Sequence, residues 1–182
     1  AVREINVEVD IKSFNSSMEK QKEQARKAWI GSGEIKIDQV WFDLANSLDP
    51  TEFLGFNTLK SQAKILAIIE NGRTVKKIVE GNIAEIIFNQ SPFYAESGGQ
   101  ISDFGSLNNE FFEAKIEGVS KISGLIVHKV KIIKGKINNG DLVNLIVDSK
   151  KRNSIAANHS ATHLMHQALK DVIGPQVNQR GS

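Results

Sequence analysis

Cysteine is absent from this sequence of 182 residues, and that absence narrows the kinds of site it can hold. A disulfide framework is excluded, and any zinc site would have to be built without thiolates from this chain. Only four histidines are present to act as ligands. The lack of cysteine is also consistent with a reducing compartment, and we expect a cytoplasmic protein.

Long hydrophobic runs are absent as well. No apolar stretch approaches the roughly 18–20 residues needed to cross a bilayer, so no membrane partner is expected. The net charge is only +2 and the pI is 8.8, a basic lean that indicates nucleic acid only if the basic residues cluster. The sequence starts at Ala1 rather than at a methionine, and no signal pattern follows. We therefore expect it to begin inside a longer polypeptide.

An amphipathic helix is predicted near the N-terminus, starting after the N-cap residue Asp10. Gly31 and Gly33 are typical of a helix end and predict a domain boundary at residue 33. A second short helix is predicted over residues 39–47, before Pro50 interrupts regular structure. The apolar positions of the first helix recur near helical spacing: Phe14, Met18, Ala25, Ala28 and Trp29.

The next hundred residues predict a small antiparallel barrel or sandwich, because short β-rich runs alternate with turn residues. The pair Asn71-Gly72 between two such runs is a strong hairpin signal, since a type I′ turn needs positive φ at both positions. The runs cover residues 60–70, 73–79, 83–88, 101–107, 111–119, 124–133 and 142–147.

A long final helix is predicted after the N-cap Asp148, ending at Gly174-Pro175. At about 100° per residue, its histidines lie on one side and its apolar residues on the opposite, core-facing side. The predicted fold is therefore α+β: a helical arm (residues 1–33), a β-barrel (34–147) and a C-terminal helix that begins a further domain (148–182). The apolar side comprises Ala161, Leu164, Met165, Ala168 and Val172.

His159 and His163 stand one helical turn apart, which directs their ring nitrogens toward a common point and is a recurring arrangement in zinc sites. A zinc site needs about four ligands, and the only other histidines are His128 and His166. Either the pair binds no metal, or further ligands lie outside this chain. A zinc protease is excluded because Ser160 occupies the position of the general base glutamate. His128 lies in an apolar run and is predicted to be a buried strand histidine.

A second candidate site is the segment PFYAESGGQISDFG at residues 92–105. Paired Gly98 and Gly99 permit backbone conformations closed to other residues, and they let a ligand approach the backbone. The alternative is a tight turn with a bulge. Glu96 and Asp103 have no spacing that would fix them as an acid–base pair, and no catalytic residue is assigned.

Lysines recur in the later β-runs, and such residues either form a solvated face or meet phosphates if they converge on one surface. No nucleotide-binding glycine loop is present, so this segment is not expected to bind ATP itself. The lysines are Lys115, Lys121, Lys129, Lys131, Lys134 and Lys136.

Three runs together resemble alanyl-tRNA synthetases. They are FYAESGGQ at residues 93–100, NHSATHLMH at 158–166 and VNQRGS at 177–182. The resemblance covers the chain from about residue 10 onward. It implies a segment that contains the end of the tRNA-recognition region, a β-barrel and the first part of the editing domain.

The resemblance also implies an activity and its residues. The family couples alanine to tRNA(Ala) with ATP and magnesium, bound in a catalytic domain absent from this chain, and hydrolyses tRNA(Ala) mischarged with serine or glycine. His159 and His163 would be two zinc ligands, completed by a downstream Cys and His. Thr162 and Gln179 would line the editing pocket that receives the tRNA acceptor end. The glycine motif, Gly98, Gly99 and Gln100 with Asp103, would face that pocket.

Two other hypotheses account for the same residues. A freestanding alanyl-tRNA editing hydrolase shares the barrel and the histidine pair, but it lacks a helical arm. A barrel-type binding module without activity would use all three motifs structurally. For this chain by itself, we expect weak zinc binding, no deacylase activity and a solvent-exposed histidine face.

Overall fold

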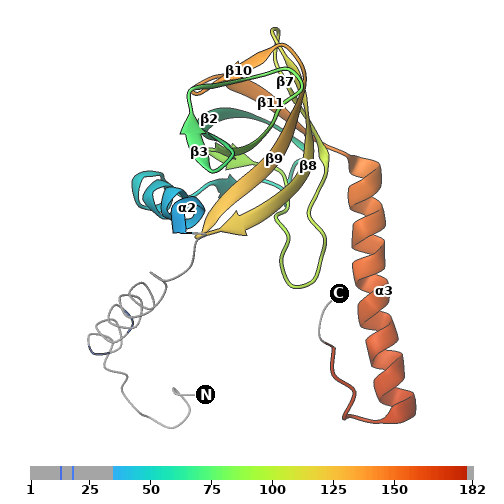
Figure 1. Ribbon diagram of the computed structural model, residues 1–182. Coiled ribbons are helices and arrows are strands. Elements are labelled where there is room, and N and C mark those ends of the chain that lie inside the picture. The colour runs from blue at the N-terminus through green and yellow to red at the C-terminus, as the bar shows by residue number, and fades with distance from the viewer. Residues whose placement is uncertain (1–12, 14–17, 19–34, 180–182) are drawn as a thin grey trace. The chain divides into compact units, whose positions relative to one another are not determined.

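Six strands close into an antiparallel barrel (Figure 1). Around the barrel the order is β11-β7-β8-β9-β5-β2, and antiparallel pairing of β11 with β2 closes the ring. Closure pairs the edges that an open sheet would leave exposed. The α+β class and the barrel are thereby confirmed. The strands are β2 (Lys60–Glu70), β5 (Ile83–Phe88), β7 (Gly105–Asn108), β8 (Glu113–Ile122), β9 (Leu125–Lys134) and β11 (Leu142–Val147).

This computed structural model describes Ser13, Met18 and residues 35–179. The predicted N-terminal helix and the glycines at 31 and 33 lie outside the described residues, except that Ser13 and Met18 are each helical. The chain divides into two compact units, Ala1–Gln39 and Val40–Ser182. The barrel belongs to the second unit.

Strand β2 closes the barrel because it serves two neighbours in succession. Its first residues, from Lys60 to Lys64, pair with β11, and its later residues pair with β5. The register shifts between Ile65 and Ala67, which marks a β-bulge. Bulges bend a strand and increase its twist, so β2 turns from one partner to the next at this point.

The barrel interior is filled by aliphatic and aromatic side chains that alternate with outward residues along each strand. Strand β9 shows the pattern clearly, because Val130 and Ile132 are buried whereas Lys129 and Lys131 are exposed. Fully buried side chains of the main core include Ile65, Ile86, Phe88, Phe93, Leu107, Ile116 and Leu145.

A second hydrophobic cluster lies on the outside of the barrel, where helix α2 (Ile35–Ser47) contributes Trp41. Trp41 is 3% exposed and packs with Ile69, Ile87 and Val127. Strand β5 is therefore buried on both faces, with Ile86 inside the barrel and Ile87 in the outer cluster. This explains why the end of the strand, residues 86–88, is continuously apolar rather than alternating.

The predicted hairpin at Asn71-Gly72 is confirmed. Both residues have positive φ, 51° and 71°, as a type I′ turn requires, and they join β2 to β3 (Arg73–Val75). The predicted run 73–79 is broken, however, because β3 pairs with β2 whereas β4 (Lys77–Val79) pairs with β10 (Lys136–Asn138). A short parallel pair, β1 (Glu52–Phe53) with β6 (Gln90–Ser91), completes the strands.

The predicted strand over residues 101–107 is wrong in its first half. Only β7 from Gly105 is extended and paired, whereas residues 101–104 form no strand. The reason is a competing set of contacts: the backbone N–H of Asp103 donates to the Tyr94 carbonyl, at 3.1 Å. The side chain of Asp103 also accepts from the Tyr94 N–H, at 2.7 Å. These hydrogen bonds hold residues 101–104 in a loop instead of in a strand.

Helix α3 (Ser149–Ile173) confirms the predicted final helix and both of its ends. The Asp148 side chain accepts a hydrogen bond from the Lys151 N–H, as an N-cap does, and the Gly174 N–H donates to the Lys170 carbonyl. The tail beyond Gly174 turns back alongside the helix (Figure 1). In the described part of the chain, neither α2 nor α3 is long and apolar enough to cross a membrane.

Candidate functional site

Two imidazoles on α3 point toward each other. The Nε2 atoms of His159 and His163 lie 3.1 Å apart, and the rings meet edge to face with centroids 4.5 Å apart. Residues four apart lie one above the other on the same helical face, so the helix itself produces this convergence. The predicted direction of the two rings is therefore observed.

The C-terminal tail orients one of these rings. Gln179 places its side-chain carbonyl oxygen 3.1 Å from Nδ1 of His163. An amide oxygen only accepts, so Nδ1 of His163 is the donor in this contact. Metal-ligating histidines are commonly oriented in this way, by a hydrogen bond from the nitrogen that does not bind the metal.

The geometry fits two positions of a tetrahedral zinc site. Two nitrogens at about 2.0–2.1 Å from a tetrahedral ion are about 3.4 Å apart. The observed Nε2–Nε2 separation of 3.1 Å is therefore close to what an ion would need. Within residues 35–179 no group of three or more His, Cys, Asp or Glu side chains could hold a metal ion. Among the described residues, the histidine pair could therefore supply two ligands of such a site.

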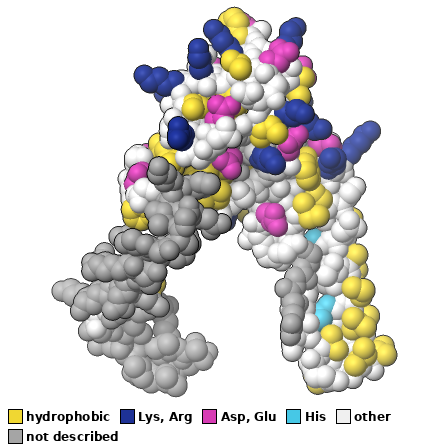
Figure 2. Space-filling model, viewed as in Figure 1, with side chains coloured by type: hydrophobic (Ala, Val, Ile, Leu, Met, Phe, Trp, Pro, Cys, Tyr) yellow, Lys and Arg dark blue, Asp and Glu magenta, His cyan; other side chains and the backbone are white. Residues whose placement is uncertain are grey.

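The tail also covers part of the histidine face. His166 Nε2 lies 3.2 Å from the Val177 carbonyl, to which it donates. His159 and His166 are half-buried, whereas His163 is exposed. The predicted exposure of this face therefore holds for His163 only. Figure 2 shows the histidines on one side of α3 and hydrophobic side chains on the other.

Thr162 lies on the edge of the same face and is half-buried. Its hydroxyl donates to the carbonyl of Asn158 one turn earlier, at 2.9 Å. Because that bond uses the hydroxyl hydrogen, the Thr162 oxygen keeps lone pairs that can accept a hydrogen bond from a ligand.

The apolar side of α3 does not face a core among the described residues, contrary to the sequence prediction. Leu164 is 73% exposed, Met165 60% and Val172 85%, and no residue of α3 is buried. The periodicity correctly separated an apolar from a histidine side. It did not show whether another element covers the apolar side, because periodicity describes one helix and not its neighbours.

The paired glycines form the tip of a tight turn. Gly98 and Gly99 have φ of 61° and 87°, and Ser97 and Gln100 exchange backbone hydrogen bonds across them. A Cβ at Gly98 would meet no atom within 4 Å, so glycine is required there by backbone conformation and not by space. The tip is exposed and Gln100 half-buried. The turn interpretation is confirmed, and an exposed turn of this kind can also contact a ligand.

Asp103, at the base of the same loop, is 3% exposed and forms an ion pair with Arg152 of α3. The guanidinium Nε lies 3.1 Å from both carboxylate oxygens. Arg152 also donates to the carbonyls of Gly55, at 3.2 Å, and Pro92, at 2.6 Å. One side chain therefore ties three chain segments together through the planar, multidentate geometry that arginine provides.

Arg152 was missed by the sequence analysis, which assigned it no role in the site. Its partner is 49 residues away, so no local signal identifies the pair. Arg152 joins the base of the glycine loop to the first turn of α3, and it therefore helps to position the loop relative to the helix. His159 follows seven residues later, about two helical turns further along.

His128 is a buried structural histidine, as predicted. It is 0% exposed on β9, with Ser91 Oγ 2.8 Å from Nε2 and the Ile86 carbonyl 3.3 Å from Nδ1. Nδ1 therefore carries the proton, and the Ser91 hydroxyl donates to Nε2 while accepting from the Phe93 N–H, at 3.1 Å. Burial lowers the pKa of His128 to about 3, and the bond to Ile86 opposes the shift.

The lysines of the later strands occupy several environments. Lys115 and Lys131 lie directly opposite each other across β8 and β9, whereas Lys129 lies opposite Glu85 on β5. Burial raises the pKa of Glu85, and Lys129 opposes that shift. Figure 2 shows basic side chains spread over the barrel with acidic ones between them. They are therefore not one uniform phosphate-binding surface.

The sequence that forms this barrel, glycine turn and helix has known relatives. The family of tRNA synthetases class II (A) matches residues 1–151. The chain belongs to this family.

Within the family, the chain is similar to alanine–tRNA ligases. Over 182 residues it is 44% identical to that of Cereibacter sphaeroides, covering 100% of this chain and 21% of the relative. It is 43% identical to the enzyme of Mesorhizobium japonicum and 42% identical to that of Dinoroseobacter shibae, again over 100% of this chain. The chain spans about a fifth of the length of these relatives.

Proposed function

We propose that this chain is a segment of an alanine–tRNA ligase that attaches alanine to tRNA(Ala) in two ATP-dependent steps. The family match and the identity along the whole chain support this function. ATP and magnesium would bind in a catalytic domain outside these residues. The segments 1–33, 34–147 and 148–182 would be the end of the tRNA-recognition region, the barrel and the first part of an editing domain. The family match ends at residue 151, close to the last of these divisions.

The finer proposal is that α3 contributes to hydrolysis of mischarged tRNA(Ala). A pocket that accepts alanine discriminates poorly against glycine, because a missing methyl is worth only about 1–3 kcal/mol, and it rejects serine only weakly. A second site that removes these errors is therefore useful. The observation that supports its location on α3 is the convergence of His159 and His163, with Nε2 atoms 3.1 Å apart.

His159 and His163 would hold zinc, with a Cys and a His from later in the polypeptide as the other ligands. When bound, zinc would supply either an activated water or a fixed position for the substrate end. Gln179 would orient His163 through the 3.1 Å bond to Nδ1. Keeping the proton on Nδ1 leaves Nε2 available as a ligand.

Thr162 and Gln179 would recognise serine through its hydroxyl. The Thr162 hydroxyl already donates to Asn158, so it would accept a hydrogen bond from the serine hydroxyl. An alanyl group lacks that donor and would not form this hydrogen bond, which is worth about 0.5–1.5 kcal/mol. Gly98, Gly99 and Gln100 would face the pocket from the barrel. The buried pair of Asp103 with Arg152 would hold the base of that loop.

The test uses the full-length protein with alanine, ATP, magnesium and tRNA(Ala). We expect alanylation by the unaltered protein, and release of serine from Ser-tRNA(Ala). The double variant His159→Ala/His163→Ala should lose zinc and serine release by more than about 100-fold, because even outer-shell partners of zinc ligands contribute about 10- to 100-fold. Alanylation should be unchanged. His166→Ala is the matched control, since His166 lies on the same face and donates instead to Val177.

The outcomes separate the hypotheses. Serine release without alanylation would indicate a freestanding editing hydrolase, and neither activity would indicate a binding module. Zinc and serine release that survive in the double variant would overturn the assignment of the histidine pair. For the 182-residue chain by itself, we expect zinc to be lost on dialysis against a chelator, and no serine release.

A further inference from the structure

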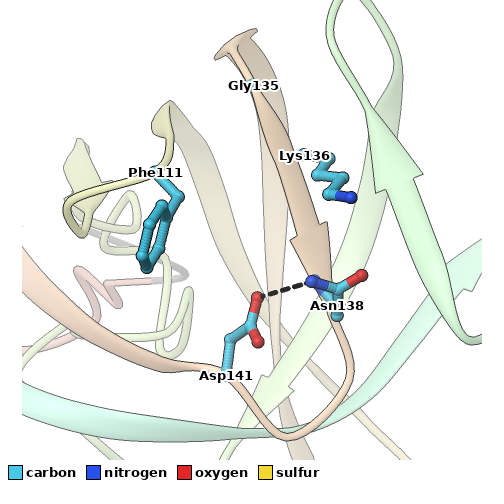
Figure 3. A pocket seen from close by; sticks show the side chains of 5 residues that line it. All are labelled: Phe111, Gly135, Lys136, Asn138 and Asp141. Atoms are coloured by element: carbon cyan, nitrogen blue, oxygen red, sulfur yellow. Dashed lines mark hydrogen bonds between the residues drawn. The ribbon is translucent and has the colours of Figure 1, made fainter.

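An aromatic ring stands exposed at one end of the barrel, beside a hollow that the site above does not use. Phe111, between β7 and β8, is 79% exposed. Its ring forms one wall of a hollow of about 700 Å³, also lined by Gly135, Lys136, Asn138 and Asp141 (Figure 3). That volume is in the range of small-molecule sites, about 300–1,000 Å³.

The loop that carries Phe111 is held in place. Asn109 accepts through Oδ1 from the N–H groups of Phe111, at 2.8 Å, and Phe112, at 3.1 Å. Its own N–H donates to the Phe112 carbonyl at 3.2 Å, and Phe112 is buried beneath it. These hydrogen bonds form an Asx turn, and the buried Phe112 anchors it. The turn therefore holds the Phe111 ring in its exposed position.

Gly135 allows the loop to approach β10 closely. A Cβ at Gly135 would lie 2.3 Å from the Phe111 carbonyl oxygen, and its φ is 82°. A side chain at this position would therefore displace the loop that presents the ring. The hollow thus depends on a glycine for both space and backbone conformation.

The polar residues of the hollow have complementary chemistry. Asp141 uses Oδ2 to accept from the backbone and side-chain N–H groups of Asn138, at 2.8 and 3.2 Å. Its second oxygen remains able to accept a hydrogen bond from a ligand, because a carboxylate oxygen has two lone pairs. Lys136 also lines the hollow and is exposed, with its ammonium directed away from the Phe111 ring (Figure 3). A ring, an acceptor and a cation therefore line the same hollow.

We infer that this hollow binds an unpaired RNA nucleotide. The base would stack on Phe111, an amino group of the base would donate to Asp141, and Lys136 would contact the adjoining phosphate. Recognition of single-stranded RNA uses stacking on exposed aromatic rings and hydrogen bonds to base edges. The choice of RNA as ligand rests on the proposed function, in which tRNA is the partner.

The charges around the hollow favour one nucleotide over a long duplex. Lys136 and the Asp141 carboxylate both line the hollow, and a second carboxylate, Glu80, accepts from the Gly135 N–H at 3.3 Å. Duplex binding relies on many phosphate contacts with basic side chains. Because the charges around the hollow are mixed, stacking and hydrogen bonds to the base edge must provide most of the affinity and of the preference between bases. Adenine and cytosine carry an exocyclic amino group, whereas uracil does not.

The test measures binding of single-stranded RNA hexamers of adenosine, cytidine or uridine to the 182-residue chain. We expect the adenosine and cytidine hexamers to bind more tightly than the uridine hexamer. Phe111→Ala should weaken their binding by roughly 5- to 100-fold, the usual contribution of one stacked base. Phe111→Trp should retain binding and report it by quenching of the new indole. Lys136→Gln should reduce the slope of log affinity against log salt by about one.

Phe56→Ala is the matched control, because Phe56 is also an exposed phenylalanine, at 88%. It should leave hexamer binding unchanged, and both alanine variants should keep the melting temperature of the unaltered chain. No binding at millimolar RNA, equal binding by Phe111→Ala, or equal loss in Phe56→Ala would each overturn the site. Equal binding of all three hexamers would overturn the base preference assigned to Asp141. Hexamer binding by a protein that fails to alanylate tRNA would instead contradict the proposed function alone.

Discussion

In the barrel, nearly every strand contributes fully buried side chains, whereas the 25 residues of helix α3 include none that is buried. Leucine illustrates the contrast: Leu107 on β7 is 0% exposed, and Leu164 on α3 is 73% exposed. The barrel is therefore stabilised by its own core. Within the described residues, α3 is held instead by its N-cap, by Arg152 and by the returning tail.

The contrast separates stability from chemistry. A closed barrel with a packed interior provides rigid edges and loops, and the proposed site residues lie on the glycine turn and on α3. Helices outside a core depend on neighbours, since intrinsic propensity contributes little. The barrel can therefore tolerate a change in site residues without losing its fold, and five substitutions measure how far this separation holds.

The largest effect is expected for Leu107→Ala. Truncation of a fully buried leucine removes contacts and leaves a cavity, and such changes cost about 2–5 kcal/mol. Leu107 lies opposite Ala114 on β8 and Leu145 on β11, and the short side chain of Ala114 cannot extend into the space that truncation leaves. Chemical denaturation of the 182-residue chain would measure the loss. A change below 1 kcal/mol would mean that the barrel core is far more adaptable than its packing indicates.

Next in size is Arg152→Met, which tests the connection between the two regions. Removal of the guanidinium leaves the Asp103 carboxylate, 3% exposed, without its charged partner. Loss of one member of a buried pair costs about 3–5 kcal/mol, and partial exposure of Arg152 reduces our expectation to about 2–4 kcal/mol. The double variant Asp103→Asn/Arg152→Met should recover part of this loss in a double-mutant cycle. If the losses in the two single variants add up to the loss in the double variant, the Asp103–Arg152 pair has no coupling energy.

A smaller effect is expected from pH, through His128. Burial lowers the pKa of His128 to about 3, below the value of about 6.5 in the unfolded chain. The unfolded state therefore binds the proton first, so stability is fully present above about pH 6.5 and falls as the pH is lowered toward 3. At pH 5 the loss should be about 2 kcal/mol.

The matched variant is His128→Gln, which removes this titration. The difference in unfolding free energy between the unaltered chain and the variant should shrink from pH 7 to pH 5. A difference that is constant over this range would show that His128 titrates normally in the folded barrel. The measurement is chemical denaturation at each pH.

More of the barrel than of the candidate site could be predicted from the sequence. Strands 60–70, 83–88 and 142–147 were predicted at their observed bounds, because apolar β-branched runs and turn residues are local signals. The short strands β1, β6 and β10 were not predicted, since two or three residues carry no periodicity. They exist because partners distant in sequence pair with them.

The candidate site depends more than the barrel strands on contacts between residues that are distant in sequence. The convergence of His159 and His163 follows from helical spacing, and was therefore predictable. The pairing of Asp103 with Arg152 and the position of Gln179 on Nδ1 of His163 require the folded loop and tail. No local pattern encodes either contact. The roles of Thr162, Gln179 and the glycine turn in editing stay predictions.

A smaller effect still is expected for Asp148→Ala, which removes the N-cap of α3. The Asp148 side chain satisfies the Lys151 N–H at 3.1 Å, and the loss of such a cap costs about 0.5–2 kcal/mol. The effect should be concentrated in α3. Hydrogen exchange of amides in the first turn of α3 should accelerate, while amides of β8 and β9 keep their protection. Equal acceleration in the strands would show that helix and barrel unfold as one cooperative unit.

The smallest effect is expected for Leu164→Ala, which makes the same chemical change as Leu107→Ala on the exposed side of α3. Because Leu164 is 73% exposed, truncation removes little buried surface, and alanine has a slightly higher helix propensity than leucine. The unfolding free energy of the 182-residue chain should change by less than about 0.5 kcal/mol. The same substitution in the full-length protein gives the decisive comparison. A loss of about 2 kcal/mol or more there would show that another part of the polypeptide packs on this side of α3, whereas no loss in either protein would show that Leu164 contributes no packing in either.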